Sequence, residues 1–529
     1  MRALGFLLAS TLLLAVAGCG GSDKETTKDA SAGDTAQDSV QADQVADQTP
    51  GEDKVADKDE GSDAQPDTVT PPLPLRVGVA RTAITPEFEP YTDTNGNNHW
   101  DEGEPFEDLN DNDQYDSLYV GGFGLRTPTG VHDDLWASSI AIEVKGELFI
   151  LTSLDLLGLS MKRVNAIKSA VEKQIPAGHN WSSERMVIAS THTHQGPDTM
   201  GVFGPNSGPG WDEGYLSFVV ETSIANALEA VENLQPATLW VTSASDTLEL
   251  IRDIDPPEIF DPYVGILQAR DMEGKVLATL LSIANHPEAC WGDNTLISSD
   301  YVHFLREATE KEIGGQTMFF AGALGLMQTP ATIGEPGFER AEYVGQTYAQ
   351  KVLEALENAE QIDLATVTSK PEYFKVKVVL ENPELYIGVA GDIAEGYSDY
   401  LYREEEPPCD MFGCLDLPIF IWRLGDQLTL LTFPGELTPE LIVGGIVTPP
   451  DYEGDFPDAP AEPHVLDHVK TKYRFIIGLA DSATGYYYPK MTFDPGVTYG
   501  QHHGAGPNAA MTMMTAVVEK LQSINALFE

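Results

Sequence analysis

The stretch Met186-Val-Ile-Ala-Ser-Thr-His192-Thr-His194-Gln-Gly-Pro197 carries the interpretation of this chain. The apolar run 186–189 predicts a buried strand, and Gly196-Pro197 is a strong turn signal. Residues two apart on a strand point the same way, so we expect His192 and His194 to share a face at the strand's carboxyl end. Open α/β sheets place their ligands there, and imidazole is a common metal ligand. The stretch therefore predicts a metal site. The alternative is a pair of hydrogen-bonded, inert histidines.

Working outward, predicted strands alternate with predicted helices from about residue 130 onward. Apolar strands are expected at 148–154, 186–189, 238–243, 278–284, 318–321, 428–433 and 474–479. Helices are expected after Ser160 and at 215–234, 300–313 and 339–359. This alternation predicts an α/β fold in which a mostly parallel or mixed sheet is flanked by helices. Because no internal repeat or linker interrupts it, residues 75–529 are expected to form one large domain.

The composition excludes nucleic acid as a partner and a disulfide framework as the basis of the fold. The 529 residues include 83 acidic and 31 basic side chains, for a formal net charge of −52. Nucleic-acid binding needs Lys and Arg to neutralise phosphates, so no nucleic acid is expected as a partner. Four cysteines are too few for a disulfide framework.

The N-terminal residues 1–18 resemble a bacterial lipoprotein signal peptide. A charged start and a short apolar run lead to Val16-Ala-Gly-Cys19, whose Cys19 would be acylated. Residues 19–74 are acidic and cannot bury enough surface to fold, so they are expected to be a disordered tether. We therefore expect an exported lipoprotein, anchored in the outer membrane or at the cell surface. In that compartment Cys409 and Cys414 could form a disulfide, and Cys290 would stay free.

An acidic segment at 90–118 predicts structural calcium. Asp93, Asn95, Asn97, Asp101 and Glu104 occupy positions 1, 3, 5, 9 and 12 of an EF-hand-like calcium loop. Position 6 is Asn98, which can adopt positive φ. A second run repeats the first four ligand positions but has Tyr119 at position 12; its candidate ligands are Asp108, Asn110, Asn112 and Asp116. The alternative is a solvated acidic loop.

The polar candidates for the site all lie at the carboxyl end of a predicted strand or in the loop just beyond it. They are Asp155, His192, His194, His286, Glu436 and Tyr486. Converging strand ends form pockets, so these side chains are expected to gather. Two histidines and a carboxylate with an open fourth position form the ligand set of a hydrolytic zinc site.

The same motifs resemble a known family. Gly130-Val-His132, Ser190 to Pro197, Phe433-Pro-Gly-Glu436 and Gly478 to Tyr486 occur in the order seen in the neutral/alkaline ceramidases. The resemblance covers about residues 76–529. It implies an amide hydrolase of sphingolipid metabolism with one zinc ion, held here by His132, His194, Glu436 and Tyr486. It places His192 beside the zinc or against the substrate carbonyl. The family usually continues into an immunoglobulin-like domain, which is not expected here.

One departure from the family changes the expected mechanism. The ceramidase segment Gly-Asp-Val-Ser-Pro-Asn, which holds the serine nucleophile, corresponds to Gly325-Leu326-Met327-Gln328-Thr329-Pro330 here. Leu326 replaces the aspartate, and Gln328 or Thr329 falls at the serine. We therefore expect zinc to polarise the carbonyl and activate water, with His192, His286 or Asp155 as the general base.

The expected substrate is an N-acyl lipid or another amide, and the expected cofactors are catalytic Zn²⁺ and structural Ca²⁺. One alternative is a hydrolase of a different acyl substrate. Another is a catalytically inactive surface protein that binds calcium and zinc.

Overall fold

A computed structural model describes residues 75–529, and these residues belong to one compact unit. The description leaves out residues 110, 112, 117, 205–209, 255–257, 365–367, 383–399, 405–407, 410, 446–453 and 495–502. The predicted signal peptide, Cys19, the tether, Asn110 and Asn112 therefore lie outside the described residues. Among the helices that are described, none has the length and apolar character needed to cross a membrane.

The main sheet has nine strands and is mixed. Its ladders β4–β5 and β9–β11 are parallel, and its other described ladders are antiparallel. Of the two arrangements left open by the sequence, the mixed one is therefore present. Its order is β11 (Gln316–Ala321), β9 (Val276–Ile283), β8 (Val264–Asp271), β6 (Gln235–Ala244), β1 (Arg76–Ala83), β3 (Trp136–Val144), β4 (Glu147–Leu154) and β5 (Met186–Ser190), with β13 (Glu360–Ile362) also paired to β6.

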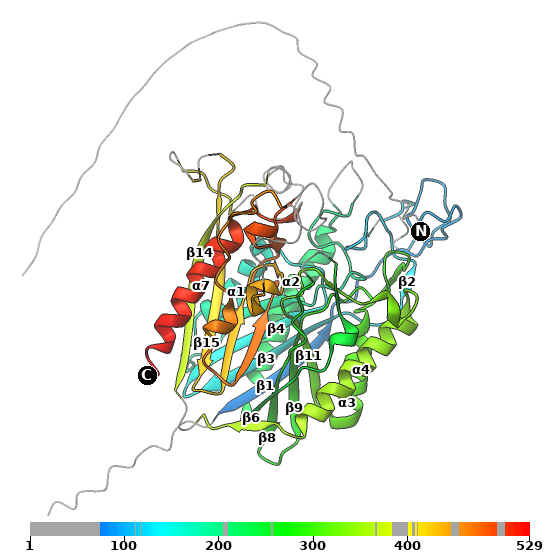
Figure 1. The fold of residues 1–529 in the computed structure, drawn as a ribbon. Coiled ribbons are helices and arrows are strands. Elements are labelled where there is room, and N and C mark those ends of the chain that lie inside the picture. The colour runs from blue at the N-terminus through cyan, green and yellow to red at the C-terminus, as the bar shows by residue number, and fades with distance from the viewer. Residues whose placement is uncertain are drawn as a thin grey trace, which may run out of the picture. The chain divides into compact units, whose positions relative to one another are not determined.

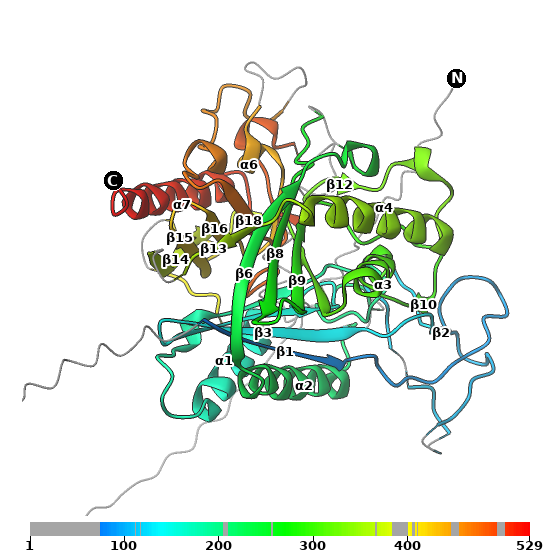
Figure 2. The ribbon, with the colours of Figure 1, turned by 90° about the horizontal axis from the view of Figure 1, so that it is seen from below.

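The two halves of the main sheet meet at a narrow junction. β1 and β6 pair only through Arg76 with Pro236 and Val77 with Gln235. Figure 2 shows β6, β8 and β9 running steeply across the direction of β1 and β3. The sheet is therefore strongly twisted between its halves.

A second sheet of four strands was only half anticipated from the sequence. Its strands are β14 (Ser369–Val379), β15 (Cys414–Leu424), β16 (Leu428–Thr432) and β18 (Tyr473–Ile477), of which only the last two were predicted. β16 and β18 are parallel, and the other ladders are antiparallel. The predicted disulfide between Cys409 and Cys414 is present where β15 begins, and Cys290 is free and buried.

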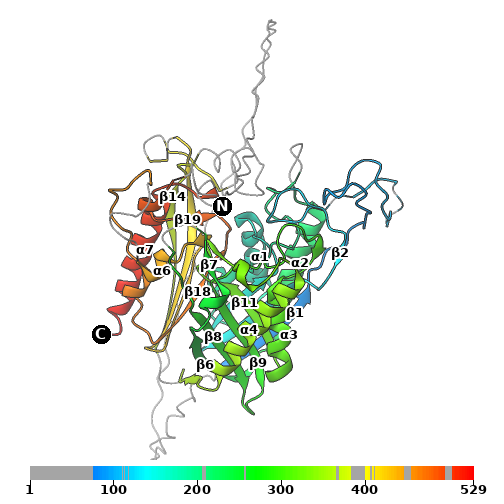
Figure 3. The same ribbon diagram turned by 45° about the vertical axis from the view of Figure 1, so that its right-hand side comes forward.

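The elements form four layers, helix–sheet–sheet–helix, because each sheet buries both faces (Figures 1 and 3). The inner faces of the sheets pack on each other, for example where Phe149 stacks on Trp422 at 4.3 Å. α7 (Ala509–Asn525) covers the outer face of the second sheet. The outer face of the main sheet is covered by α1 (Met161–Gln174), α2 (Glu213–Glu232), α3 (Tyr301–Ile313) and α4 (Phe338–Leu356).

Local sequence accounts for these helices. Ser160 caps α1 by accepting a hydrogen bond from Arg163 N, as its position before an apolar-periodic run predicts. The buried apolar side chains of α1 recur at helical spacing and face the sheet: Met161, Val164, Ile167 and Val171.

Short elements gather where the long strands end. These are β2 (Gly130–Val131), β7 (Arg252–Asp253), β10 (Leu296–Ile297), β12 (Met327–Gln328), β17 (Glu436–Leu437), α6 (Glu440–Val443) and β19 (Tyr486–Tyr487). The pairs β2–β10, β7–β12 and β17–β19 fix the loops that build the site.

Candidate metal centre

A cavity of about 730 Å³ opens at the carboxyl ends of β5, β9, β11, β16 and β18. Its walls are mainly apolar, with Phe123, Leu157, Met200 and Trp291 among them. Its polar lining residues are His192, His194, His286, Glu288, Gln328, Glu436, Thr484, Tyr486 and His503. A large apolar pocket with a few convergent polar groups is the usual form of a small-molecule site.

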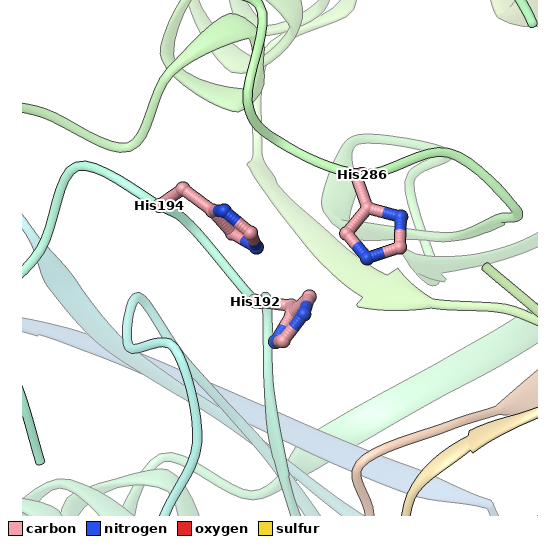
Figure 4. Close-up of side chains that lie close together, drawn as sticks. All are labelled: His192, His194 and His286. Atoms are coloured by element: carbon pink, nitrogen blue, oxygen red, sulfur yellow. The ribbon is translucent and has the colours of Figure 1, made fainter. Parts of the chain in front are cut away.

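Three imidazoles form the centre of this cavity (Figure 4). His192 and His194 lie on the loop after β5, and His286 follows β9. Candidate ligand atoms of the three residues all lie within 4.8 Å of one another. The strand does not continue through the motif. β5 ends at Ser190, and His192 has a φ of 68°, a strained conformation that is common at functional sites.

Glu436, in the short strand β17 that follows β16 of the second sheet, completes the centre. Its Oε2 lies 3.3 Å from His192 Nε2 and 3.1 Å from His286 Nε2. The parallel pairing of β17 with β19 sets Glu436 directly opposite Tyr486, so both side chains leave on the same face. This register distinguishes Tyr486 from Tyr487, whose hydroxyl contacts Thr484, and both Glu436 and Tyr486 line the cavity.

Backbone carbonyls orient two of the imidazoles. His192 Nδ1 donates to the Leu157 carbonyl at 2.6 Å, and His286 Nδ1 donates to the Met327 carbonyl at 2.8 Å. A carbonyl can only accept, so each ring carries its proton on Nδ1 when neutral and turns the Nε2 lone pair towards Glu436. Metal-binding histidines are typically held in this way by a backbone oxygen.

The electrostatics of the centre fit a cation. Burial alone would raise the pKa of Glu436, but the two adjacent imidazoles outweigh it and hold that pKa well below its usual range. Burial, reinforced by the neighbouring imidazoles, holds the pKa of His194 well below its usual range, so this ring is neutral. Within the described chain, neither ring nitrogen of this buried histidine has a hydrogen-bond partner. Two imidazole Nε2 atoms beside a carboxylate, with a third buried imidazole lacking a hydrogen-bond partner, form a donor set that suits zinc.

A second carboxylate lies on the far side of His194. Glu288 Oε2 is 3.5 Å from His194 Nδ1, and burial raises the pKa of Glu288 to about 7. The His194 ring packs directly on the backbone of Gly122, where an added Cβ would lie 2.6 Å from ring atoms. Arg126 donates to the His194 carbonyl at 2.7 Å. His194 is thus held by its surroundings and leans towards Glu288.

The structure corrects the predicted ligand set at His132. This residue follows β2 and belongs to a separate cluster with Asp133 and His303, and it does not line the cavity. The place expected for His132 is taken by His286, which the sequence had suggested only as a general base. The reason is topological: β2 pairs with β10, whereas β9 ends at the centre.

The resemblance predicted His194 as the metal ligand and His192 as its neighbour, and the geometry reverses these two roles. His192 Nε2 faces Glu436, while His194 leans towards Glu288. The geometry therefore favours His192 as the ligand and His194 as its neighbour.

Asp155, predicted as a general base, is a structural residue. Its two oxygens accept from Arg306 at 2.5 and 2.7 Å, and one of them also accepts from Trp136 N. It is fully buried and does not line the cavity. A carboxylate committed to a bidentate ion pair is not free to take a proton from a substrate or water.

The segment matching the ceramidase nucleophile contributes no hydroxyl to the cavity. Leu326 and Gln328 line it, and Gln328 Oε1 accepts from Arg252 at 2.7 Å, whereas Thr329 is buried elsewhere. Among the cavity-lining residues that the structure describes, none is Ser or Cys. Thr484 is the lining threonine, and its hydroxyl is bonded to the Pro434 carbonyl and to Tyr487.

The first acidic loop folds around its predicted ligand positions. Asp93 Oδ2 accepts from Asn98 N at 2.9 Å, and Asn98 adopts the positive φ expected at position 6. Glu104 Oε1 accepts from Thr94 N, and its Oε2 accepts from Asp101 N, so the position-12 carboxylate spans positions 2 and 9.

The second acidic loop repeats this geometry with a carboxylate that sequence reasoning missed. Asp108 Oδ2 accepts from Asp113 N, which again has positive φ at position 6. Glu89 Oε1 accepts from Leu109 N and its Oε2 from Asp116 N, again positions 2 and 9. Glu89 thus occupies the place of the missing position-12 acid. Spacing within the loop could not reveal it, because Glu89 precedes both loops.

Fold and site together define the class: a layered α/β protein with an imidazole–carboxylate centre at its strand ends. No family model and no curated protein matches the chain. The solved structures that it resembles include neutral ceramidase from Pseudomonas aeruginosa, with a TM-score of 0.60 and 15% identity, covering 85% of this chain and 74% of that chain. A ceramidase complexed with C2 has a TM-score of 0.62 and 16% identity, covering 86% and 76%. The chain therefore has the fold of the neutral ceramidases, as its motifs had suggested.

Proposed function

We propose that this protein is a metal-dependent amide hydrolase of the ceramidase type. The observation that carries the proposal is the convergence of His192 Nε2, His286 Nε2 and Glu436 Oε2 in a large apolar cavity of a ceramidase fold. These three residues, with Tyr486 beside them, would hold Zn²⁺. When bound there, zinc would polarise a substrate carbonyl and make a water molecule more acidic.

The residues around the centre support hydrolysis by water. The lack of serine and cysteine in the described cavity lining supports water, rather than a protein nucleophile, as the attacking group. His194 and Glu288 are placed to take the proton that this water loses as its oxygen bonds to the carbonyl carbon. The same pair returns a proton to the amine when the carbon–nitrogen bond breaks.

The apolar walls support an acylated substrate. Leu157, Met200 and Leu415 surround the polar centre and would accept an acyl chain rather than a charged group. An N-acyl lipid fits this lining, and a simpler acyl amide is the alternative substrate.

We further propose two features from the sequence. The lipoprotein-type N-terminus supports export and anchoring at the cell surface through Cys19. The matched geometry of the two acidic loops supports structural Ca²⁺ in each.

The test measures zinc content and hydrolysis of N-acyl-sphingosine and fluorogenic amides by the wild type and two variants. We expect stoichiometric zinc at the centre and turnover in the wild type, and loss of both in His286→Ala. His468→Ala, which removes an imidazole from outside the cavity, should keep both. A centre that binds no zinc would end the proposal. A zinc-loaded protein without turnover of any amide would instead indicate a binding protein, as Leu326 and Gln328 in the cavity would permit.

A further inference from the structure

We infer that His132, Asp133 and His303 form a second metal site, which takes a first-row divalent transition metal such as Zn²⁺. The inference is independent of the proposed function, because none of these residues lines the catalytic cavity.

The donor atoms already stand close to metal-binding geometry. His132 Nδ1 lies 2.8 Å from Asp133 Oδ2, and His303 Nδ1 lies 3.7 Å from Asp133 Oδ1. One ligand atom from each residue lies within 4.8 Å of the other two. Zinc–ligand bonds of about 2.0–2.2 Å place tetrahedral ligands roughly 3.4 Å apart. Small rotations of two side chains would therefore close the site.

Asp133 is held in place by the segment between β10 and α3. Its Oδ2 accepts from the Ser298 hydroxyl, and its Oδ1 accepts from Ser299 N at 2.9 Å and from the Ser299 hydroxyl at 3.1 Å. Hydrogen bonds to a ligating carboxylate are the usual outer support of a metal site. Its side chain is 3% exposed, so its charge is shielded from water and attracts a cation more strongly.

The two imidazoles are also oriented, and they leave one side open. The His132 ring stacks on Phe338 at 3.7 Å with an interplanar angle of 8°, and it meets the His303 ring edge-on at 5.9 Å. The side chains of His132 and His303 are 30% and 31% exposed, so a metal ion and a water ligand can reach them. Two imidazoles and one carboxylate favour zinc, nickel or cobalt over calcium or magnesium, which prefer oxygen.

A metal here would stabilise the loop that carries the catalytic histidines. His132 follows β2, His303 lies in the first turn of α3, and Phe338 begins α4, so the ion would join three elements. Ser298, which supports Asp133, also accepts from the Thr193 hydroxyl at 2.9 Å and donates its N–H to the Gln195 carbonyl. We therefore assign this second site a structural role behind the loop at 192–195.

The experiment counts bound zinc in the full chain after removal of metals by chelation, with calcium present to fill the acidic loops. Calorimetric titration of the wild type should give two zinc ions per chain. His303→Ala should bind one and still lose it when His286→Ala is added, and His286→Ala alone should also bind one. Cobalt bound to His286→Ala should give the visible absorption of a low-coordinate site with imidazole ligands.

A His303→Ala variant that binds as much zinc as the wild type would overturn the inference, as would a cobalt spectrum that His132→Gln leaves unchanged. If His303→Ala fails to fold, His132→Gln provides the same count, because its side chain is partly exposed. Failure of the catalytic centre is distinguishable, since it would leave one zinc ion that disappears with His303→Ala rather than with His286→Ala.

Discussion

At the scale of single residues, Glu288 provides the sharpest test of the mechanism. It lies beside His194 rather than beside Glu436, so it is placed for proton transfer and not for metal binding. We expect Glu288→Gln to keep its zinc and its melting temperature while kcat falls about 10²- to 10⁴-fold, the usual range for a general acid–base. Zinc content and steady-state kinetics measure these effects, with Glu273→Gln on an exposed hairpin as the matched control. An unchanged kcat would remove Glu288 from the mechanism.

Glu462 predicts a pH effect on stability away from the site. Its Oε1 accepts from Lys490 N, but its Oε2 makes no hydrogen bond within the described structure, and burial raises its pKa. A carboxyl group with a raised folded-state pKa stabilises the fold below its unfolded-state pKa, and this contribution is lost as pH rises through the folded-state pKa. When the pH is raised from about 4.5 to about 8, the melting temperature of the wild type should therefore fall more than that of Glu462→Gln. Parallel curves from thermal scans of the two proteins would contradict this reasoning.

The sequence reveals which residues carry the chemistry better than it reveals how they are partnered. His192, His194, His286, Glu436 and Tyr486 all follow strands, and the structure brings them to one cavity. Strand ends can be recognised from local periodicity, but which ends meet depends on long-range pairing that a single sequence does not encode locally. His132 was misplaced because β2 has only two residues and joins a different ladder.

At the scale of elements, the acidic insertion is coupled to the site. Thr127 N donates to the Asn98 carbonyl of the first loop, and the Thr127 hydroxyl accepts from Trp100 N. The adjacent Arg126 holds the backbone at His194. Order in the first acidic loop therefore bears on the wall of the cavity that holds the candidate centre.

Two carboxylates allow the two loops to be tested separately. We expect the wild type to bind two calcium ions, and Glu104→Gln and Glu89→Gln to bind one each, since each loses one spanning carboxylate. Calcium at about 100 times its Kd should stabilise the wild type by about 2.7 kcal/mol. Calcium titration and thermal scans in a calcium-selective chelator measure both effects. Two ions retained by Glu89→Gln would show that Glu89 is only a hydrogen-bond acceptor.

At the scale of the whole molecule, the second sheet is the part of the fold that the sequence predicted least completely. β14 is largely half-buried and carries Lys370, Glu372, Lys375 and Lys377 among its apolar residues, so its strand character is masked. Yet the chain that follows strands β16 and β18 of this sheet carries Glu436 and Tyr486, while the loops after β5 and β9 of the main sheet carry the three histidines. The imidazole–carboxylate centre therefore depends on the packing of the two sheets against each other.

Because the residues of the centre come from chain segments of both sheets, sheet packing and zinc binding should both contribute to the free energy of unfolding. Phe149 of β4 is fully buried and stacks on Trp422 of β15, so Phe149→Ala should lower the free energy of unfolding by about 3–5 kcal/mol. Zinc bound across both sheets at about 1,000 times its Kd should restore about 4 kcal/mol. Urea unfolding with and without zinc, in a His303→Ala background that removes the second site, measures both terms. Phe218→Ala on α2, where Phe218 is 42% exposed, should change stability by less than about 0.5 kcal/mol. If zinc failed to stabilise Phe149→Ala, or if the sheets unfolded in separate transitions, the centre would not depend on the sheet interface as argued.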